Sequence, residues 1–558
     1  MILIPILTIL GFSYLFSSRL KTKFIFAVLI VTSLLISLLY CAAMVNFLPA
    51  ATYLFYFLGT IYFAYYCTKI SKDDFLKNIK PYVNEIISLS IIIIAFFIYT
   101  SGSYLHAYDD FCHWGVFTKE LLYFGFFENQ NSASSIITTH AHYPRGSAVY
   151  HYFMLLLSGY SEGNVLFAHF LLHLIFLAPL MANRKFWQTI FFIAVMLAIV
   201  VLYTTGLRSI YNDSTIGLMF GCIFAIYILE EDKHKAMLFV LPIVMLLVFF
   251  REVGLWLASF ASIIIISHHI KFYKGGRNKK DVILYCLLLT LPILCSFIWL
   301  SYFKNTHDFF GRREHSFSNI VAIIENFNEQ HKLLLLNYGK FFLKFLVKEG
   351  SIALYIIGGL AWYSVRKYKP SLLREYKFLL VATFICYLIF ILWRLYLYFF
   401  TFTYAEAIKG ASLLRYLGCY SLAFGIISCA YIKNSIFLFN QSKKELFIFA
   451  ILLAVASFSV IKNTLRIKQL SLPQKIFNEQ SEIVKKLLEQ GVEVNFDFGN
   501  KQDGLQCYML NYSLAPYLNN KYLKECMKAP ENSIINKDFS EENKIIYRPF
   551  VNELDIKK

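Results

Sequence analysis

Long apolar runs recur along the whole sequence and restrict the kind of fold that it can adopt. The stretches 24–44 and 282–303 contain no Asp, Glu, Lys or Arg, and about 20 apolar residues in a helix cross the ~30 Å hydrocarbon core of a bilayer. The pattern predicts about 14 transmembrane helices, so the expected fold class is an all-α polytopic membrane protein. The predicted spans are 2–18, 24–44, 47–68, 86–101, 163–182, 187–206, 214–229, 236–250, 254–268, 282–303, 351–365, 378–396, 417–432 and 445–461.

The composition agrees with a membrane protein. Of the 558 residues, 58% are hydrophobic and only 16% are charged, and the mean hydropathy of +0.56 lies above the range of soluble domains. The first apolar run begins at Met1 without a basic segment or a small-residue cleavage motif. We therefore expect a retained helix there and not a removed signal peptide. Because the eleven cysteines include no CxxC pair, a zinc site or a thiol redox motif is not expected.

The basic residues indicate how the chain is oriented. The net charge of +18 could suggest nucleic acid, but Lys and Arg lie mostly in short links between apolar runs, where they act as topology signals. No nucleic-acid partner is expected, and the basic links are predicted to be cytoplasmic. These links are 19–23, 69–80, 183–185, 271–280, 365–377 and 442–444. The assignment places both termini outside and requires 146–159, with ~12 apolar residues, not to cross the membrane.

The chain is predicted to have two parts. Residues 1–462 form the transmembrane domain, with outer loops at 102–162 and 304–350, and residues 463–558 form a small α/β domain on the same outer side. In this tail "NEQSEIVKKLLEQG" has the pattern of an amphipathic helix and "VEVNFDF" alternates like a strand. Cys507 and Cys526 could form a disulfide in an oxidising compartment, although two reduced thiols are an equally acceptable interpretation.

The stretch "AYDDFCHWG", residues 107–115, places ionisable side chains directly after a predicted outward-going helix. Asp109 or Asp110 could serve as a general base at the membrane surface, since partial desolvation raises the pKa of a carboxylate. The plainer alternative is that the two aspartates cap a loop helix. His113 lies three to four residues further on, and Trp114 is a residue type that stacks on sugar rings or anchors at interfaces.

The same outer loop contains "HAHYPRG", residues 140–146. His140, His142 and Arg145 could donate hydrogen bonds to an anion. Tyr143 precedes a proline that favours an extended backbone there, and this places Tyr143 among the candidate contacts.

Other outward links add charged residues. Asp213, Arg251, Glu406 and Arg415 all lie at predicted outer helix ends, where single charges are often only snorkelling anchors. Arginines on the outer side run against the positive-inside bias. A phosphate or pyrophosphate group would account for them.

Taken in order, "DDFCHWG", "HAHYPRG", "YND", "REVG" and "ASLLRY" resemble the motifs of the bacterial glycosyltransferase C superfamily, integral membrane enzymes that use polyprenyl-phosphate sugars. The motifs cover residues 105–416. Asp110 stands where many relatives have glutamate, Arg145 stands in place of a second proline, and four predicted spans precede the acidic motif.

The resemblance implies the roles of Asp109, Asp110 and Arg415, and the roles of the other candidates are inferred from their location. Asp109 or Asp110 would be the catalytic base. Arg415, together with Arg251, His140 and Arg145, would bind the donor phosphate. The sugar or the acceptor would contact His113, Trp114, His142, Tyr143, Asp213 and Glu406. No cofactor is required, although a divalent metal could bridge two carboxylates and a phosphate.

The resemblance also implies an activity. The chain would transfer a sugar from a polyprenyl-phosphate donor to a cell-envelope acceptor on the periplasmic face of the bacterial inner membrane, with lipids around it. An O-antigen or polysaccharide polymerase or ligase is the nearest alternative, since it shares the span number and the outer arginines. A lipid or glycan transporter is the alternative from another class. It is less favoured because the spans carry few charges and no internal repeat is evident.

Overall fold

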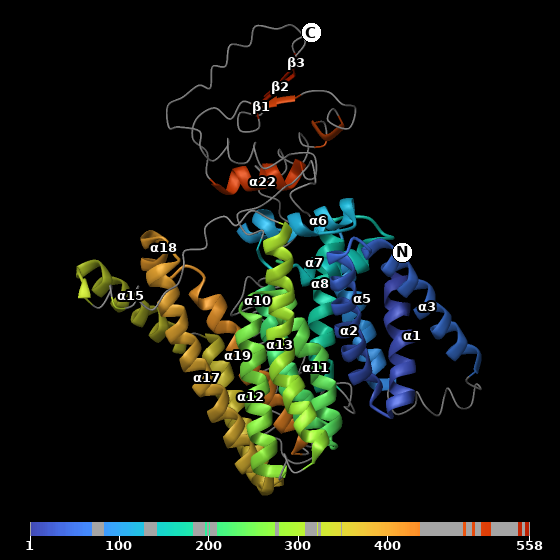
Figure 1. Cartoon of the computed structure of the whole chain (residues 1–558), viewed down its shortest axis with the longest axis vertical. Helices are drawn as coiled ribbons and strands as arrows, with labels where there is room; N and C mark the ends of the chain where they lie inside the picture. The colour runs from blue at the N-terminus through green and yellow to red at the C-terminus, as the bar shows by residue number, and fades with distance from the viewer. Residues whose placement is uncertain are drawn as a thin grey trace.

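The computed structural model describes 2–69, 83–127, 142–181, 196–197, 200, 209–273, 278–306, 321, 325–347, 349–435, 482, 484–486, 494–496, 504–514, 545–548 and 553–556. Long helices pack side by side with alternating direction, and the strands lie beyond one end of this bundle (Figure 1). The helices of the first part are α1 (Leu3–Leu20), α2 (Phe24–Met44), α3 (Leu48–Lys69), α5 (Val83–Thr100), η2 (Asp110–Trp114), α6 (Gly115–Phe124), α7 (Gly146–Leu155), α8 (Glu162–Leu177) and η3 (Ala178–Leu180). Those that follow are α10 (Asn212–Leu229), α11 (Lys233–Phe250), α12 (Gly254–Tyr273), α13 (Lys279–Thr306), α15 (Glu329–Leu346), α16 (Glu349–Tyr368), η5 (Pro370–Leu372), α17 (Leu373–Phe400), α18 (Tyr404–Ile408) and α19 (Leu413–Asn434).

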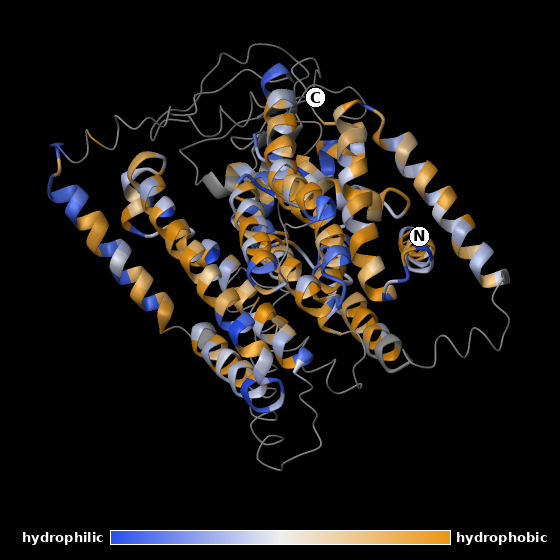
Figure 2. Ribbon diagram, turned by 60° about the horizontal axis from the view of Figure 1, so that its bottom comes forward, coloured by the Kyte–Doolittle hydropathy of each residue, from blue (hydrophilic) through white to orange (hydrophobic). Residues whose placement is uncertain are grey.

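The described helices confirm a polytopic membrane protein. Nine of them are long and apolar enough to cross a bilayer, and apolar residues predominate along the helices of the bundle (Figure 2). Large apolar side chains such as Leu38, Ile293 and Leu392 are exposed on these helices. Helices α3, α5 and α16 also coincide with predicted spans, although they are not among those nine. The spans predicted at 187–206 and 445–461 fall mainly or wholly outside the described residues.

The segment 146–159 does not form a span. Its helix α7 has only 10 residues, and all of them are buried. At 1.5 Å per residue it is about 15 Å long, half of the hydrocarbon thickness. The condition on which the predicted orientation of the following helices depends is therefore met, and the orientation itself stays a prediction.

The predicted outer loop 304–350 is more ordered than expected. It contains α15, an 18-residue helix that begins with a capping box formed by Asn328 and His331. Leu334 is buried at 4% exposure, whereas Leu336 is 55% exposed. This helix projects from the side of the bundle near α18 (Figure 1).

The two ends of the bundle differ in charge. Basic residues gather at the end where α1, α12 and α16 finish, and we call it the basic end; they are Arg19, Lys21, Lys23, Lys271, Lys279, Lys280, Arg366, Lys367 and Lys369. The opposite end, which we call the site end, carries residues 101–127 and 142–161, the link 251–253 between α11 and α12, and the start of α19 (Figure 1).

Close packing fixes α10 against α19 at the site end. A Cβ at Gly217 would lie 2.8 Å from the Cα of Cys419, and one at Gly221 would lie 3.0 Å from the Cα of Ala423. Small residues allow two helix backbones to approach closely in a membrane. This contact brings the first turns of α10 and α19, with their charged residues, next to each other.

The described residues of the C-terminal part include both strands and a helix, and β1 (Val494–Phe496) lies within the predicted strand "VEVNFDF". Strand β1 pairs in parallel with β2 (Ile545–Arg548), and β2 pairs antiparallel with β3 (Glu553–Ile556). Helix α22 (Gly504–Leu514) lies between the sheet and the site end of the bundle (Figure 1). Cys507 is disulfide-bonded, and since Cys526 lies outside the described residues, the predicted pairing with it stays a prediction.

Candidate functional site

The acidic motif forms one turn of π-helix, η2, which continues directly into α6. Such wide turns are often found at functional sites because they redirect the side chains around them. Gly115 allows the turn to pack, since a Cβ there would lie 2.6 Å from the carbonyl oxygen of Asp110 and 2.7 Å from the ring of Tyr512. As a result, the two neighbouring aspartates face different surroundings.

Asp109 faces the start of α19. Its carboxylate accepts a hydrogen bond of 2.7 Å from Nη1 of Arg415, and both side chains are partly exposed, at 18% and 17%. The backbone N–H of Asp109 donates to the hydroxyl of Tyr211 at 2.7 Å. Arg415 lies over the Tyr211 ring at 4.4 Å and donates to the hydroxyl of Ser412 at 2.5 Å. Asp109 and Arg415 therefore meet at a site where both can reach solvent or a ligand.

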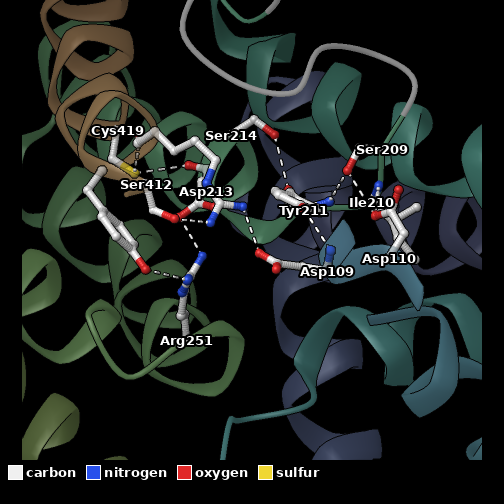
Figure 3. Close-up of polar contacts among 12 residues, drawn as sticks. Asp109, Asp110, Ser209, Ile210, Tyr211, Asp213, Ser214, Arg251, Ser412 and Cys419 are labelled. Carbon is white, nitrogen blue, oxygen red and sulfur yellow. Dashed lines mark hydrogen bonds and ion pairs between the residues drawn. The ribbon is translucent and has the colours of Figure 1, made fainter. Parts of the chain in front are cut away.

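A second, more buried pair adjoins the first. Arg251 donates to the carboxylate of Asp213, and Nη1 of Arg415 lies 3.8 Å from the other oxygen of the same carboxylate. The side chains of Asp213 and Arg251 are 0% and 6% exposed. Burial disfavours the charge on Arg251, but Asp213 outweighs this effect and holds the pKa of Arg251 above its usual value. The result is an alternating row, Asp109–Arg415–Asp213–Arg251, which we call the charged row (Figure 3).

Asp110 points away from the charged row. Its carboxylate accepts hydrogen bonds from the hydroxyl of Ser209 at 2.8 Å and from the backbone N–H groups of Ile210 at 3.1 Å and Ala107 at 3.2 Å (Figure 3). Burial raises the pKa of Asp110 to about 7, although these hydrogen bonds act in the opposite direction. Asp110 thus joins the acidic motif to the segment before α10, and Asp109 is the better candidate for the base.

His113 and Trp114 lie inside an aromatic cluster. Trp114 stacks on Tyr143 with ring centroids 5.8 Å apart, and His113 meets the same tyrosine edge-on at 5.3 Å. The guanidinium of Arg251 lies 5.7 Å from both the Trp114 and the Tyr143 rings. Trp114 is only 2% exposed in this structure, and its contact with a sugar stays a prediction. The Trp114 and Tyr143 rings of this cluster pack against the guanidinium of Arg251.

The residues of the "HAHYPRG" motif lie in different surroundings. His142 lies at the rim, with Nε2 3.7 Å from the carboxylate of Glu252, beside the charged row. Arg145 is buried and donates to Glu120 at 3.2 Å, while its guanidinium lies 4.5 Å from the Phe117 ring. Because Glu120 neutralises it, Arg145 does not fit the expected phosphate contact. His140 lies outside the described residues.

Glu406 also has a local role. Its carboxylate accepts hydrogen bonds from the backbone N–H of Thr403 at 3.1 Å and from the Thr403 hydroxyl at 2.9 Å. This is the capping box that begins α18. The structure thus gives Glu406 a capping role, and the predicted contact with the sugar or the acceptor stays a prediction.

Three residues at the site were not among the predicted ones. The hydroxyl of Ser209 donates a hydrogen bond to Asp110, and the hydroxyl of Ser412 accepts one from Arg415. The hydroxyl of Tyr416 accepts a hydrogen bond of 3.1 Å from Nη2 of Arg251. Ser412 and Tyr416 could have been found from the "SLLRY" motif itself, in which they flank the arginine. No sequence signal marks Ser209.

The described residues contain no group of three or more His, Cys, Asp and Glu side chains that could hold a metal. Asp109 and Asp110 also turn to different partners, Arg415 and Ser209. The pair therefore does not fit a divalent cation shared between the two carboxylates, which the sequence left as a possibility.

Comparison with known proteins adds little to this geometry. The chain matches no family model and no curated protein. It is similar to the crystal structure of ArnT from Cupriavidus metallidurans in the apo state, with a TM-score of 0.39 and 12% identity over 79% of this chain and 76% of that chain. A likeness at this level establishes neither a family nor an activity. The function of the site therefore has to be inferred from the residues that form it.

Proposed function

We propose that this chain is a membrane glycosyltransferase of the glycosyltransferase C type. It transfers a sugar from a polyprenyl-phosphate-linked donor to a glycan, lipid or protein acceptor of the cell envelope. The observation that carries the proposal is the contact of 2.7 Å between Asp109 and Arg415 at the end of the membrane helices. A carboxylate and a guanidinium side by side supply the base and the phosphate ligand that such a transfer needs.

The proposed reaction is a single displacement with inversion. Asp109 accepts the proton of the acceptor hydroxyl as that oxygen forms a bond to the anomeric carbon of the donor sugar. The bond between this carbon and the phosphate oxygen breaks, and the lipid phosphate leaves with the electron pair. Arg415 and Arg251 stabilise the charge that develops on the phosphate. Asp213 holds the two arginines, since it contacts both of them.

Binding of the donor would also release the base. In the free protein Nη1 of Arg415 is bonded to the Asp109 carboxylate. A donor phosphate competes for the same N–H groups, because arginine binds phosphate and carboxylate with the same fork of donors. Asp109 is then free to accept a proton only when the donor is in place. This order would limit hydrolysis of the donor by water.

The orientation of the site follows from the charge of the two ends. The positive-inside rule supports a cytoplasmic position for the basic end of the bundle, so the proposed position of the charged row is the periplasmic side of a bacterial inner membrane. The C-terminal part lies at this same end, where Tyr512 of α22 accepts a hydrogen bond of 2.6 Å from Lys119 of α6. Here it is placed to cover the site and to take part in acceptor choice.

The test uses the full chain in lipid nanodiscs with a defined undecaprenyl-phosphate sugar, and mass spectrometry of the released undecaprenyl phosphate. The proposal predicts release that depends on an added envelope acceptor. Deletion of the gene should leave envelope glycans that lack one sugar but have normal chain length. Short, unpolymerised chains would instead identify a polymerase or ligase.

A further inference from the structure

Arg394 is a buried arginine that the charged row does not include. It lies in α17, near the end of that helix at the site end, and is only 4% exposed. Its guanidinium lies 3.5 Å from the centre of the Tyr416 ring, and the rings of Phe402, Trp393 and Tyr398 surround it at 5.6, 5.7 and 5.9 Å. The aromatic rings thus hold the cation in one place.

Part of this guanidinium has no partner. In the described structure Nε and Nη2 of Arg394 are buried without a hydrogen-bond acceptor. These two nitrogens form one edge of the guanidinium, and their N–H bonds run parallel, which is the geometry that takes two oxygens of a phosphate or a carboxylate. Leaving charged donors unpaired in a buried place is costly, so this edge is suited to an anion that arrives later.

Arg394 is coupled to the charged row through Tyr416. The guanidinium groups of Arg394 and Arg251 lie 3.5 and 5.1 Å from the centre of the Tyr416 ring, and the Tyr416 hydroxyl accepts a hydrogen bond from Arg251. Asp213 lies within electrostatic reach of Arg394 as well. Arg394 therefore belongs to one cluster with Arg251, Arg415 and the two aspartates, Asp109 and Asp213.

We infer that Arg394 is a third phosphate-binding residue, which takes the two free oxygens of the donor phosphodiester on its Nε–Nη2 edge while Arg251 and Arg415 bind from the other side. This inference rests on the proposed function and extends it. Arg394 belongs to a membrane helix, so the lipid chain of the donor would run along α17.

The experiment measures ligand-induced thermal stabilisation of the full chain in detergent. The probes are undecaprenyl phosphate and undecaprenol, the neutral alcohol of the same chain length. The variants are Arg394→Met, which keeps the bulk and removes the charge, and Arg394→Lys, which keeps the charge and removes the fork. The control is Arg366→Met, because Arg366 also lies over an aromatic ring, Trp362 at 5.1 Å, but at the basic end.

Undecaprenyl phosphate should stabilise the wild type and Arg366→Met alike, whereas undecaprenol should not. Arg394→Met should bind the phosphate at least about tenfold more weakly, since a charge-assisted pair of hydrogen bonds is lost. The affinity of Arg394→Lys for undecaprenyl phosphate should fall several-fold. If Arg394→Met does not accumulate in the membrane, the test is made with Arg394→Lys alone. A donor titration should show the loss in KM more than in kcat.

The results that would contradict the role of Arg394 differ from those that would contradict the proposed function. If the Arg394 variants melt earlier without ligand but bind undecaprenyl phosphate as the wild type does, Arg394 is a structural residue and the inference is wrong, while the proposed function stands. If the wild type and the Arg366 control bind undecaprenol as well as undecaprenyl phosphate, or bind neither, the phosphate donor itself is wrong and both proposals fail.

Discussion

Arg415 and Asp109 are separated by 306 residues in the sequence, yet Nη1 of one lies 2.7 Å from the carboxylate of the other. Three elements cooperate to produce this contact: the π-turn η2, the first turn of α10 with Asp213, and the first turn of α19. Because α10 packs closely on α19 through Gly217, the position of Arg415 is fixed by the core of the bundle. The base and the phosphate ligand are thus held on a rigid frame.

Replacing Arg415 with glutamine should weaken use of the donor. The variant loses charge-assisted hydrogen bonds to phosphate, each worth about 1.5–3 kcal/mol, so the KM for the donor should rise roughly tenfold or more. Initial rates over a range of donor concentrations check this. Arg374→Gln, an exposed arginine at the start of α17, should behave like the wild type. An unchanged donor KM in Arg415→Gln would remove this residue from the phosphate site.

Asp110 should make stability depend on pH. Burial raises its pKa in the folded chain from 3.8 to about 7, so between about pH 4 and pH 7 the folded state holds a proton that the unfolded state has lost. The free energy of unfolding should therefore fall as the pH rises through this window, by at most about 4 kcal/mol at ~1.4 kcal/mol per pKa unit.

The measurement compares melting temperatures of the wild type and Asp110→Asn from pH 4.5 to pH 8. Relative to the variant, which cannot ionise, the wild type should lose stability up to about pH 7 and then stay level. A constant difference between the two proteins at all pH values would show that Asp110 does not titrate in this range.

The buried ion pair between Arg145 and Glu120 should matter for folding and not for the donor. Arg145→Met leaves Glu120 in a buried place without its cation and should cost about 3–5 kcal/mol of stability. Replacing both partners, as Arg145→Met with Glu120→Leu, should recover much of the loss, because a well-packed apolar pair avoids the desolvation cost. Thermal unfolding of the two single variants and of the double variant measures this coupling.

A different outcome would restore the role that the sequence suggested for Arg145. If Arg145→Met melts like the wild type but needs a much higher donor concentration, this arginine contacts the phosphate after all.

Tyr512 should hold the C-terminal part on the site end. Its hydroxyl donates to Glu162 at 2.9 Å, its carbonyl accepts from Lys119 at 2.6 Å, and its ring lies 5.1 Å from that of Phe111 in η2. Tyr512→Ala removes the first and the last of these contacts, so amide hydrogen exchange in 504–514 should become several-fold faster. Tyr404→Ala, at an exposed position of α18, should leave this exchange unchanged. Equal protection in Tyr512→Ala would mean that other contacts hold the helix.

The sequence predicts the membrane helices well because the bilayer sets their length. A run such as 24–44 has to be a helix of that extent, and α2 covers the same residues. Helix α15 was missed because its four consecutive leucines point in all directions: Leu334 is 4% exposed, while Leu333 and Leu335 are each 44% exposed. Because every position in this run is apolar, the sequence shows no alternation of apolar and polar residues with a helical period.

The sequence predicts which residue types form the site, but it does not predict which partner each side chain faces. The sequence identified Asp109 and Asp110 as a pair, but only the π-turn decides that one faces Arg415 and the other faces Ser209. In the same way, nothing in "HAHYPRG" reveals that Arg145 meets Glu120, which belongs to the preceding helix α6. Local sequence patterns do not encode these pairings, because tertiary packing produces them.

The rate of sugar transfer by Asp109→Asn tests the central claim most directly. The amide keeps the size of the side chain and can still bond to Arg415, but it cannot accept the acceptor proton. At saturating donor and acceptor the rate should fall about a hundredfold or more. Asp232→Asn, a matched change at an exposed helix cap at the basic end, should keep the wild-type rate. Wild-type activity in Asp109→Asn, at equal expression and melting temperature, would contradict the assignment of Asp109 as the base.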